Sequence, residues 1–345
     1  MPFHIIRNDI TKVEADIIVN TANPEPVIGD GTDSAIYQAA GKELLLAERM
    51  KIGGIAPGEA AITPAFDLSA KYIIHTVGPA WLDGNHGEYD VLRSCYSNSL
   101  SMAEQVKAES IAFPLIATGV YGFPKNEALD IALSEIGKFL LTHDMNIILV
   151  VFDKESFQIS EQLMGEIDQY IDEFGIDQLY TGEYTERTDM YRRRRLQEQA
   201  ECEVDEEVLS AAYAPIIAEN DDSSLEDILD NTGETFQQCL LRLIRESGVD
   251  EVEIYKKANI DRKLFSSIRC KVNYKPKKKT AVALAIALEL DMLTMMDLLS
   301  RAEIAFSPSN KFDLIISYCV TNSIYDIYEI NAILFQYDQP TLCDF

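Results

Sequence analysis

Apolar and polar positions follow two different periods in the first half of the chain. Short apolar runs are typical of strands buried on both faces, and they lie at residues 3–7, 16–20, 72–77, 110–115 and 146–152. Apolar residues at helical spacing occur between these runs and predict helices over residues 33–50, 89–107, 126–142 and 157–174. Because strands and helices alternate, we predict a three-layer α/β domain with a mainly parallel, mixed sheet over residues 1–180.

The second half of the chain has helical periodicity throughout. It predicts a separate all-α domain over residues 233–345, with helices at 236–247, 252–259, 262–270, 278–289, 294–303, 311–321 and 328–335. Residues 181–232 are acidic and turn-rich and are predicted to be an interdomain linker with some helix. The basic run Arg192–Arg195 inside this linker is either a solvated helix face or an anion-docking patch.

Aromatic residues gather near the C-terminus. They form a helical stripe made of Phe312, Tyr318, Tyr325, Tyr328 and Phe335. We expect this stripe to close a hydrophobic core or a homodimer contact rather than to stack on a nucleic-acid base.

Composition restricts the cellular setting of the protein. A chain of 345 residues is long enough for two domains, and 47% apolar residues are enough for packed cores. No apolar run reaches the roughly 18 residues that span a bilayer, and no signal peptide is visible. Six scattered cysteines favour reduced thiols, and four distant histidines suggest no metal. We therefore expect a cytoplasmic protein that needs neither a membrane nor a cofactor.

Charge is distributed unevenly along the chain. Residues 1–180 carry 11 basic and 27 acidic side chains, residues 181–240 carry 5 and 16, and residues 241–345 carry 14 of each. An acidic surface repels a polyanion over distances of about 8 Å or more at physiological salt. Any nucleic acid is therefore expected to bind the last third of the chain.

Two glycine-rich loops are candidates for holding phosphate groups. Residues 28–33, Ile-Gly-Asp-Gly-Thr-Asp, precede a predicted helix, and residues 117–122, Ala-Thr-Gly-Val-Tyr-Gly, follow a buried strand. Backbone N–H groups in such loops can bind a diphosphate without many cations, which suits an acidic protein. Asn20 and Asn23 lie at the end of another strand, and the carboxyl ends of parallel strands meet at one edge of a sheet.

Three segments, in order and spacing, resemble the ligand loops of macrodomains, a fold that binds ADP-ribose. They are residues 8–11, Asn-Asp-Ile-Thr, residues 19–23 followed by Asp33, and residues 116–124. The resemblance implies that Asp9 accepts a hydrogen bond from the adenine amine. It also implies that Asn23 holds the distal ribose and that Asp33 assists attack by water there, so these two are the candidate catalytic residues. The other ligand-binding residues would be Ile10, Asn20, Gly29, Gly31, Thr32, Thr118, Gly119, Val120, Tyr121, Gly122 and Phe152.

Several of these positions have a second interpretation or depart from the family pattern. Asp9 would otherwise be a helix cap, and Phe152 either walls the adenosine or packs in the core. His75 is expected to be a hydrogen-bonded core histidine rather than a catalyst. Asp30 replaces one glycine of the usual run and brings a carboxylate near the expected diphosphate, so it either turns outward or alters how the ligand sits.

The helical half contains a segment that resembles repressor-type helix-turn-helix domains. Residues 252–259 and 262–270 have the required spacing, and ten basic residues but one acid lie between Lys256 and Lys279. The candidate nucleic-acid-binding residues are Arg262, Lys263, Arg269, Lys275, Lys277, Lys278 and Lys279. Alternatively, this half is a protein-interaction module whose lysines are solvated or dock onto the acidic linker.

Three hypotheses on function follow. In the first, the protein hydrolyses a mono-ADP-ribosyl or O-acyl-ADP-ribose linkage, and the helical half targets it to an ADP-ribosylated macromolecule. In the second, it is a non-catalytic ADP-ribose reader coupled to a DNA- or protein-binding regulator. In the third, it is a scaffold whose helical half binds protein only.

Overall fold

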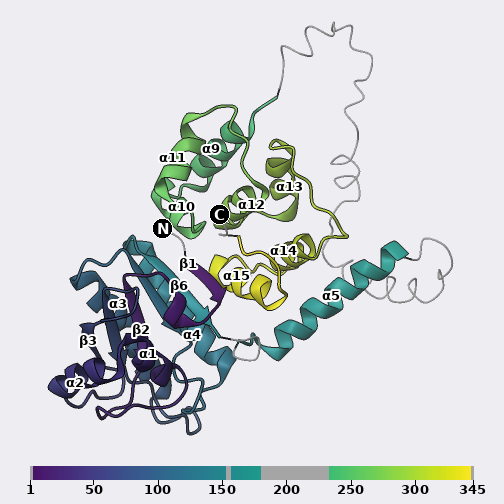
Figure 1. Cartoon of the computed structure of the whole chain (residues 1–345). Coiled ribbons are helices and arrows are strands. Elements are labelled where there is room, and N and C mark those ends of the chain that lie inside the picture. Colours follow the sequence, from purple (N-terminus) through teal and green to yellow (C-terminus); the bar gives the residue numbers. More distant parts are fainter. Residues whose placement is uncertain (1–2, 153–156, 180–232, 343–345) are drawn as a thin grey trace, which may run out of the picture.

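An α/β half and a helical half lie against each other (Figure 1). The computed structural model describes residues 3–152, 157–179 and 233–342. The predicted acidic linker, with its basic run Arg192–Arg195, lies outside the described residues. Within the described ranges, no helix combines the length and apolar character that a membrane span requires.

The α/β half is built on one mixed sheet of order β1-β6-β5-β2-β4-β3. All neighbouring strands are parallel except β3 and β4, which are antiparallel. The strands are β1 (Phe3–Arg7), β2 (Ile17–Thr21), β3 (Ala60–Pro64), β4 (Tyr72–Thr76), β5 (Ser110–Pro114) and β6 (Asn146–Val151). Five of the six were predicted, since a continuous apolar run is a strong signal for a strand buried on both faces.

The sixth strand, β3, was not predicted. Its sequence, Ala-Ala-Ile-Thr-Pro, holds three residues with low strand propensity and ends in Pro64. β3 lies at the edge of the sheet, where a proline without an N–H is tolerated. Pairing with β4, and not local propensity, makes this segment a strand.

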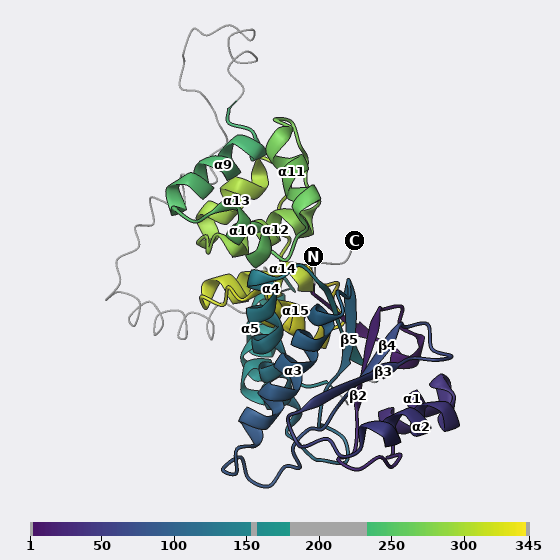
Figure 2. The same ribbon diagram turned by 90° about the vertical axis from the view of Figure 1, so that its left-hand side faces the viewer.

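Helices cover both faces of the sheet (Figure 2). On one face, α1 (Thr32–Ala40) and α2 (Lys42–Ile52) bury Ile36 and Leu45 against Ile18 of β2. On the other face lie α3 (Glu88–Gln105) and α4 (Lys125–Thr142), followed along the chain by α5 (Glu161–Leu179). The single helix predicted over residues 33–50 is wrong: Gly41, with a φ of 91°, divides it into α1 and α2.

The helical half contains seven helices within residues 233–342. They are α9 (Phe236–Ser247), α10 (Glu251–Lys257), α11 (Arg262–Cys270), α12 (Lys278–Ala287), α13 (Met292–Ser300), α14 (Lys311–Thr321) and α15 (Ile327–Gln336). The predicted boundaries hold closely because side chains cap the helices. Asp261, for example, accepts a hydrogen bond from the backbone N–H of Leu264 at 2.8 Å and starts α11.

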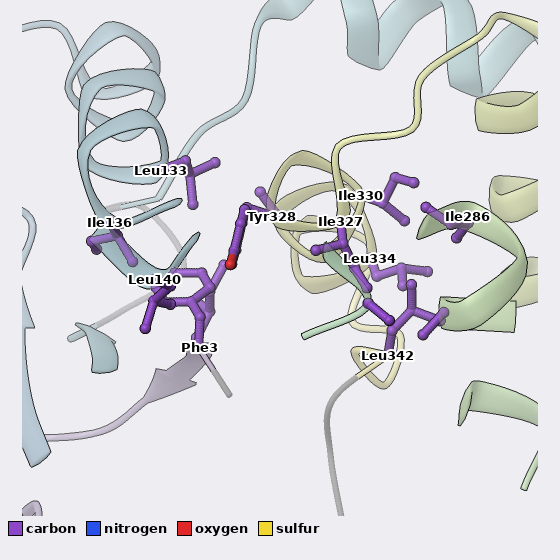
Figure 3. Close-up of a cluster of buried hydrophobic side chains, with 14 of the residues drawn as sticks. Phe3, Leu133, Ile136, Leu140, Ile286, Ile327, Tyr328, Ile330, Leu334 and Leu342 are labelled. Atoms are coloured by element: carbon purple, nitrogen blue, oxygen red, sulfur yellow. The ribbon is translucent and has the colours of Figure 1, made fainter. Parts of the chain in front are cut away.

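A continuous hydrophobic core joins the two halves (Figure 3). Tyr328 of α15 points toward α4 and packs edge-on against Phe3 of β1, with ring centroids 5.5 Å apart. A Cβ atom at Gly137 of α4 would lie 3.1 Å from the Tyr328 ring, so the glycine allows this close approach. Other members of the predicted aromatic stripe also contact the α/β half: Tyr318 donates a hydrogen bond to Glu166, and Phe335 packs against Phe157. The stripe therefore closes a core within one chain.

A polar contact also joins the halves at the edge strand β1. The side chain of Asn259, between α10 and α11, accepts a hydrogen bond from the backbone N–H of Phe3 at 2.7 Å. Its Nδ2 donates back to the Phe3 carbonyl at 3.0 Å. This amide pairs with the open edge of the sheet as a neighbouring strand would. A separate helical domain was predicted, and in the structure the helical half covers the sheet edge.

Candidate functional site

Four loops meet at the carboxyl ends of β1, β6, β5 and β2, which are consecutive neighbours in the sheet. The backbone N–H of Asn8 donates to the Val151 carbonyl at 3.0 Å and joins the loop after β1 to the end of β6. The Tyr121 hydroxyl lies 3.5 Å from Asn23 Oδ1 and joins the loop after β5 to the loop after β2. The predicted ligand loops are therefore brought to one edge of the sheet, but the prediction of Asn20 as a ligand contact is wrong, because its side chain is fully buried beneath them.

Asp33 is the most constrained of these residues. It lies in the first turn of α1 and is 3% exposed, although a carboxylate is rarely buried without partners. Its Oδ1 accepts from Asn20 Nδ2 at 2.5 Å, and its Oδ2 accepts from the backbone N–H of Gly29 at 2.6 Å. Burial raises the pKa of Asp33, while the hydrogen bonds from Asn20 and Gly29 and the charge of Arg49 oppose the rise.

Asn23 and Asp33 both approach Gly29. A Cβ atom at Gly29 would stand 3.0 Å from Asn23 Nδ2 and 3.3 Å from Asp33 Oδ2. The Asn23 amide also donates to the Val27 carbonyl at 3.1 Å, which folds the loop back on itself. The absence of a side chain at Gly29 thus lets the two candidate catalytic residues approach the same backbone segment.

Arg49 is a residue of this region that sequence reasoning missed. It is 1% exposed beneath the loop, and its guanidinium donates to the carbonyls of Asn23, Pro24 and Gly53. The sequence signal was a single arginine one helical turn after Leu45 on the buried face of a helix. Because a buried guanidinium needs acceptors, Arg49 fixes the backbone that carries Asn23.

The rest of the first glycine loop is open to solvent. Gly31 has a φ of 63° and a ψ of −126°, a conformation available almost only to glycine, and it caps α1. Thr32, the first residue of α1, is half-buried. Asp30 is exposed, which allows its carboxylate to turn outward into solvent.

The second glycine loop runs from Leu115 to Phe123. The Thr118 hydroxyl donates to the Leu115 carbonyl at 3.0 Å, and the Gly122 N–H donates to the Gly119 carbonyl at 2.9 Å. Gly122 has a φ of 68°, which favours glycine. Val120 is 83% exposed at the tip of this loop, and Tyr121 is half-buried beside Asn23. An exposed valine with no packing role is available for contact with a ligand.

The fourth part of the site lies at the ends of β1 and β6. Asp9 caps a short 3-10 helix, Ile10–Lys12, and its Oδ1 accepts from the backbone N–H and the hydroxyl of Thr11. Its second oxygen lies 3.8 Å from Lys12 Nζ and can accept a hydrogen bond from a ligand. The hydrogen bond from Thr11 contributes most to lowering the pKa of Asp9. Ile10 is buried, so it packs under this end of the site.

Phe152 follows β6 and is 73% exposed. The alternative that it packs in the core is therefore wrong, because a core phenylalanine is almost wholly buried. The Asn8 to Val151 hydrogen bond joins the loop that holds Asp9 to the end of β6, the strand that Phe152 follows. An exposed aromatic ring at the same end of the sheet as Asp9 is a suitable wall for a planar base.

His75 is a hydrogen-bonded core histidine, as predicted. It is fully buried in β4, with Nδ1 3.2 Å from Asn20 Nδ2 and Nε2 3.0 Å from the Thr63 hydroxyl. Burial, with a smaller effect from the charge of Arg49, lowers the pKa of His75 from its usual 6.5 to about 3. The ring is therefore neutral at neutral pH.

This shift predicts a pH dependence of stability. Because the unfolded state binds a proton to His75 near pH 6.5 and the folded state does not, stability should fall as pH drops from about 6.5 toward about 3. We expect the unfolding free energy of the wild type to decline more steeply over this window than that of His75→Gln, whose amide does not titrate. Denaturant unfolding at several pH values measures both. Parallel curves for the two proteins would contradict the assignment.

One group of metal-binding residue types occurs in the described part of the chain: Asp83, His86 and Glu88. Glu88 accepts hydrogen bonds from the backbone N–H groups of residues 82, 83, 84 and 86. Burial alone would raise the pKa of Glu88, but hydrogen bonds from its own backbone N–H and from those of residues 86, 83 and 82 lower it to about 2. Since backbone donors occupy the Glu88 oxygens, the group closes a loop before α3, and it does not resemble a metal site.

The predicted nucleic-acid residues of the helical half have different environments. Arg262, Lys263 and Lys277 are exposed, whereas Arg269 and Lys275 pair with Glu251 and Glu303. Lys278 pairs at 2.7 Å with Asp313, a buried carboxylate that requires a counter-charge, and Lys279 is half-buried. Lys278 therefore stabilises the helical core, and the open part of the basic surface is smaller than the sequence suggested.

Comparison with known proteins gives consistent matches. The macro domain family model matches residues 19–132. An O-acetyl-ADP-ribose deacetylase of Cronobacter sakazakii is 40% identical over 171 residues, which are 48% of this chain and 95% of that protein. A macro domain-containing protein of Listeria monocytogenes is 44% identical over 172 residues, 48% of this chain and 98% of that protein. A solved structure of an Oceanobacillus iheyensis macrodomain with MES bound is 38% identical, with a TM-score of 0.43, and covers 48% of this chain and 91% of that chain.

Proposed function

This chain belongs to the macro domain family through its first half, and from this premise we propose that it binds ADP-ribose and hydrolyses an ester or mono-ADP-ribosyl linkage at the distal ribose. Relatives more than 40% identical over about half of this chain are named O-acetyl-ADP-ribose deacetylases, which makes that ester the first substrate to test. The observation that carries the proposal is the convergence of Asn23 and Asp33 on Gly29, opposite Tyr121.

The proposed ligand position follows the loops. Asp9 and Phe152 receive the adenosine, the two glycine loops bind the diphosphate through backbone N–H groups, and Asn23 and Tyr121 contact the distal ribose. An acidic protein gains from this arrangement, because backbone dipoles attract a diphosphate without added cations. The exposed position of Asp30 supports a ligand path that avoids its carboxylate.

Asp33 is the proposed general base. A water molecule attacks the acyl carbonyl while Asp33 takes one of its protons. When the bond between the acyl carbon and the ribose oxygen breaks, Asp33 returns that proton to the ribose oxygen, so that a carboxylic acid and ADP-ribose are released. Each carboxylate oxygen keeps a lone pair beyond its hydrogen bond to Asn20 or Gly29, so both can still accept. The raised pKa of Asp33 strengthens it as a base, which favours proton transfer.

Two measurements on the full chain test this proposal. Calorimetry should detect ADP-ribose binding that weakens in Asp9→Ala, with AMP as a control for the adenine end. Chromatography should detect conversion of O-acetyl-ADP-ribose to ADP-ribose. Binding without turnover would instead support the non-catalytic reader, and absence of binding would refute both.

Gly29→Ala should reduce turnover without unfolding the protein. The added methyl group would meet the tip of the flexible Asn23 side chain, which must move by a few tenths of an ångström. Small misplacements of a positioned group reduce rates strongly, so we expect a loss of about tenfold in kcat for O-acetyl-ADP-ribose. Gly54→Ala is the matched control, since its nearest neighbours lie at 3.9 Å. Equal activities of the two variants would contradict the proposed role of Gly29.

For the helical half we propose a macromolecular partner, DNA or protein. The supporting observation is a tight α10–α11 connection in which Asn259 takes a φ of 52°, followed by exposed Arg262 and Lys263. Salt-dependent binding of a DNA duplex that is lost in Arg262→Ala with Lys263→Ala would favour DNA. If no duplex binding is detected at low or at high salt concentration, a protein partner is favoured. We also propose that the protein is cytoplasmic and that it forms a homodimer.

A further inference from the structure

A chain of buried polar side chains leads from the sheet edge to Asp33. Its members are Thr63 of β3, His75 of β4, Asn20 of β2 and Asp33 of α1, and each is at most 3% exposed. The distances along the chain are 3.0 Å, 3.2 Å and 2.5 Å. The register of the sheet produces this order. Asn20 of β2 is paired with His75 of β4. On the other side of β4, His75 is paired with Ala61 of β3, which lies two residues before Thr63 on the same face of the strand.

The hydrogen bonds in this chain have a defined direction. Asn20 Nδ2 carries two hydrogens, and it donates one to Asp33 Oδ1 and the other to His75 Nδ1. His75 Nδ1 must then be unprotonated, so the neutral ring carries its hydrogen on Nε2 and donates it to Thr63. The lowered pKa of His75 agrees with this neutral tautomer.

The orientation of the Asn20 amide is determined by these neighbours. The opposite orientation would place Asn20 Oδ1 against the Asp33 carboxylate, which would repel it. In the observed orientation Asn20 Oδ1 is buried and has no hydrogen-bond partner. An unpartnered buried acceptor is destabilising, so this arrangement costs stability and is not explained by stability. What it does supply is one fixed N–H donor for Asp33.

We propose that His75 and Thr63 are positioning residues for the reaction of Asp33, acting through the Asn20 amide. This inference rests on the proposed function, because Asp33 is its general base. Because His75 Nδ1 accepts its second hydrogen, the Asn20 amide is held in place and keeps its donor on Asp33 Oδ1. Without the His75 acceptor, the Asn20 amide is held by Asp33 alone, and its donor is aligned less strictly on Asp33 Oδ1.

The test uses the full chain and three variants. His75→Leu removes the acceptor and the donor, whereas His75→Gln retains both in an amide. Thr76→Val is the matched control, because it removes a buried hydroxyl of the same strand that donates to the Glu59 carbonyl. For each protein we would measure kcat and KM with O-acetyl-ADP-ribose, affinity for ADP-ribose, and the thermal unfolding midpoint.

We expect His75→Leu to lower kcat about tenfold, while KM and the affinity for ADP-ribose stay unchanged. A tenfold loss of rate corresponds to the loss of one hydrogen bond in the transition state. His75→Gln should recover most of this loss, and Thr76→Val should lower only the unfolding midpoint. A folded His75→Leu with normal kcat would overturn the inference. The inference would also be overturned if His75→Leu and His75→Gln lost kcat equally and in proportion to the decrease of their unfolding midpoints. If His75→Leu does not fold, Thr63→Val gives the same comparison with a smaller expected loss.

A second readout separates this inference from the proposed function. Carbon-13 NMR of the Asp33 carboxyl follows its titration with or without turnover. The titration midpoint of Asp33 should rise in His75→Leu, because the Asn20 donor is no longer held in its orientation, and it should return to the wild-type value in His75→Gln. The effects of Arg49 and Gly29 on the Asp33 midpoint are the same in both variants. Wild-type protein without turnover would refute the proposed function, and an unchanged Asp33 midpoint in His75→Leu would refute the positioning role.

Discussion

Asp33→Ala is expected to abolish most turnover while ADP-ribose binding persists. A positioned carboxylate base contributes about 10²–10⁴-fold to a rate, and the structure offers this base next to Asn23. The variant also leaves Asn20 Nδ2 and the Gly29 N–H without their acceptor, so a stability loss of about 1–3 kcal/mol should accompany it. Steady-state kinetics with O-acetyl-ADP-ribose, calorimetry with ADP-ribose and thermal unfolding together separate these effects.

Asp30→Ala is the matched control for this experiment. It removes a carboxylate from the same loop, but one that is exposed and has no place in the proposed chemistry. Because a like charge near a diphosphate is unfavourable, ADP-ribose affinity should stay equal or rise in Asp30→Ala. Asp33→Ala with near-normal kcat would show that water is activated by another group, and the assignment of Asp33 as the base would be given up.

Removal of the helical half is expected to destabilise the α/β half severely. In a fragment of residues 1–179, the surface under Tyr328 would lose its cover and expose parts of Phe3, Leu133, Ile136 and Leu140. Full burial of one such side chain is worth about 1.5–3 kcal/mol, and a whole protein is stable by only about 5–15 kcal/mol. Loss of the Asn259 contacts would also open the edge of β1. We expect aggregation, or an unfolding midpoint well below that of the full chain.

Thermal unfolding and size-exclusion chromatography of the fragment measure this effect. In the full chain, Asn259→Ala isolates the polar part of the interface, because it removes two buried hydrogen bonds to Phe3 and places alanine at a φ of 52°. Asn273→Ala, at an exposed position in the neighbouring loop, is its control. A monomeric fragment with the unfolding midpoint of the full chain would show that the halves fold independently, as the predicted boundaries at 1–180 and 233–345 imply.

Local patterns in the sequence determined most elements and the membership of the ligand loops. Continuous apolar runs such as that of β5 identify buried strands, and capping residues such as Asp261 mark helix starts within a few neighbours along the chain. The loops were located because they follow such strands, and parallel strands bring their carboxyl ends together. Asn23, Asp33 and Tyr121 were selected within these loops by their resemblance to the ligand loops of macrodomains. These signals act over short distances, so they are readable without the fold.

Tertiary structure alone decided how these parts contact one another. β3 is a strand because β4 pairs with it, and only that pairing brings Thr63 to His75. Asn259 and Phe3 are 256 positions apart, and no local pattern connects them. The environments of Asp33 and Lys278 likewise depend on partners from distant elements, because a buried charge needs its partner at a few ångströms whatever the separation in sequence. The sequence therefore determined which residues could form the site, and packing determined which of them hold one another in place.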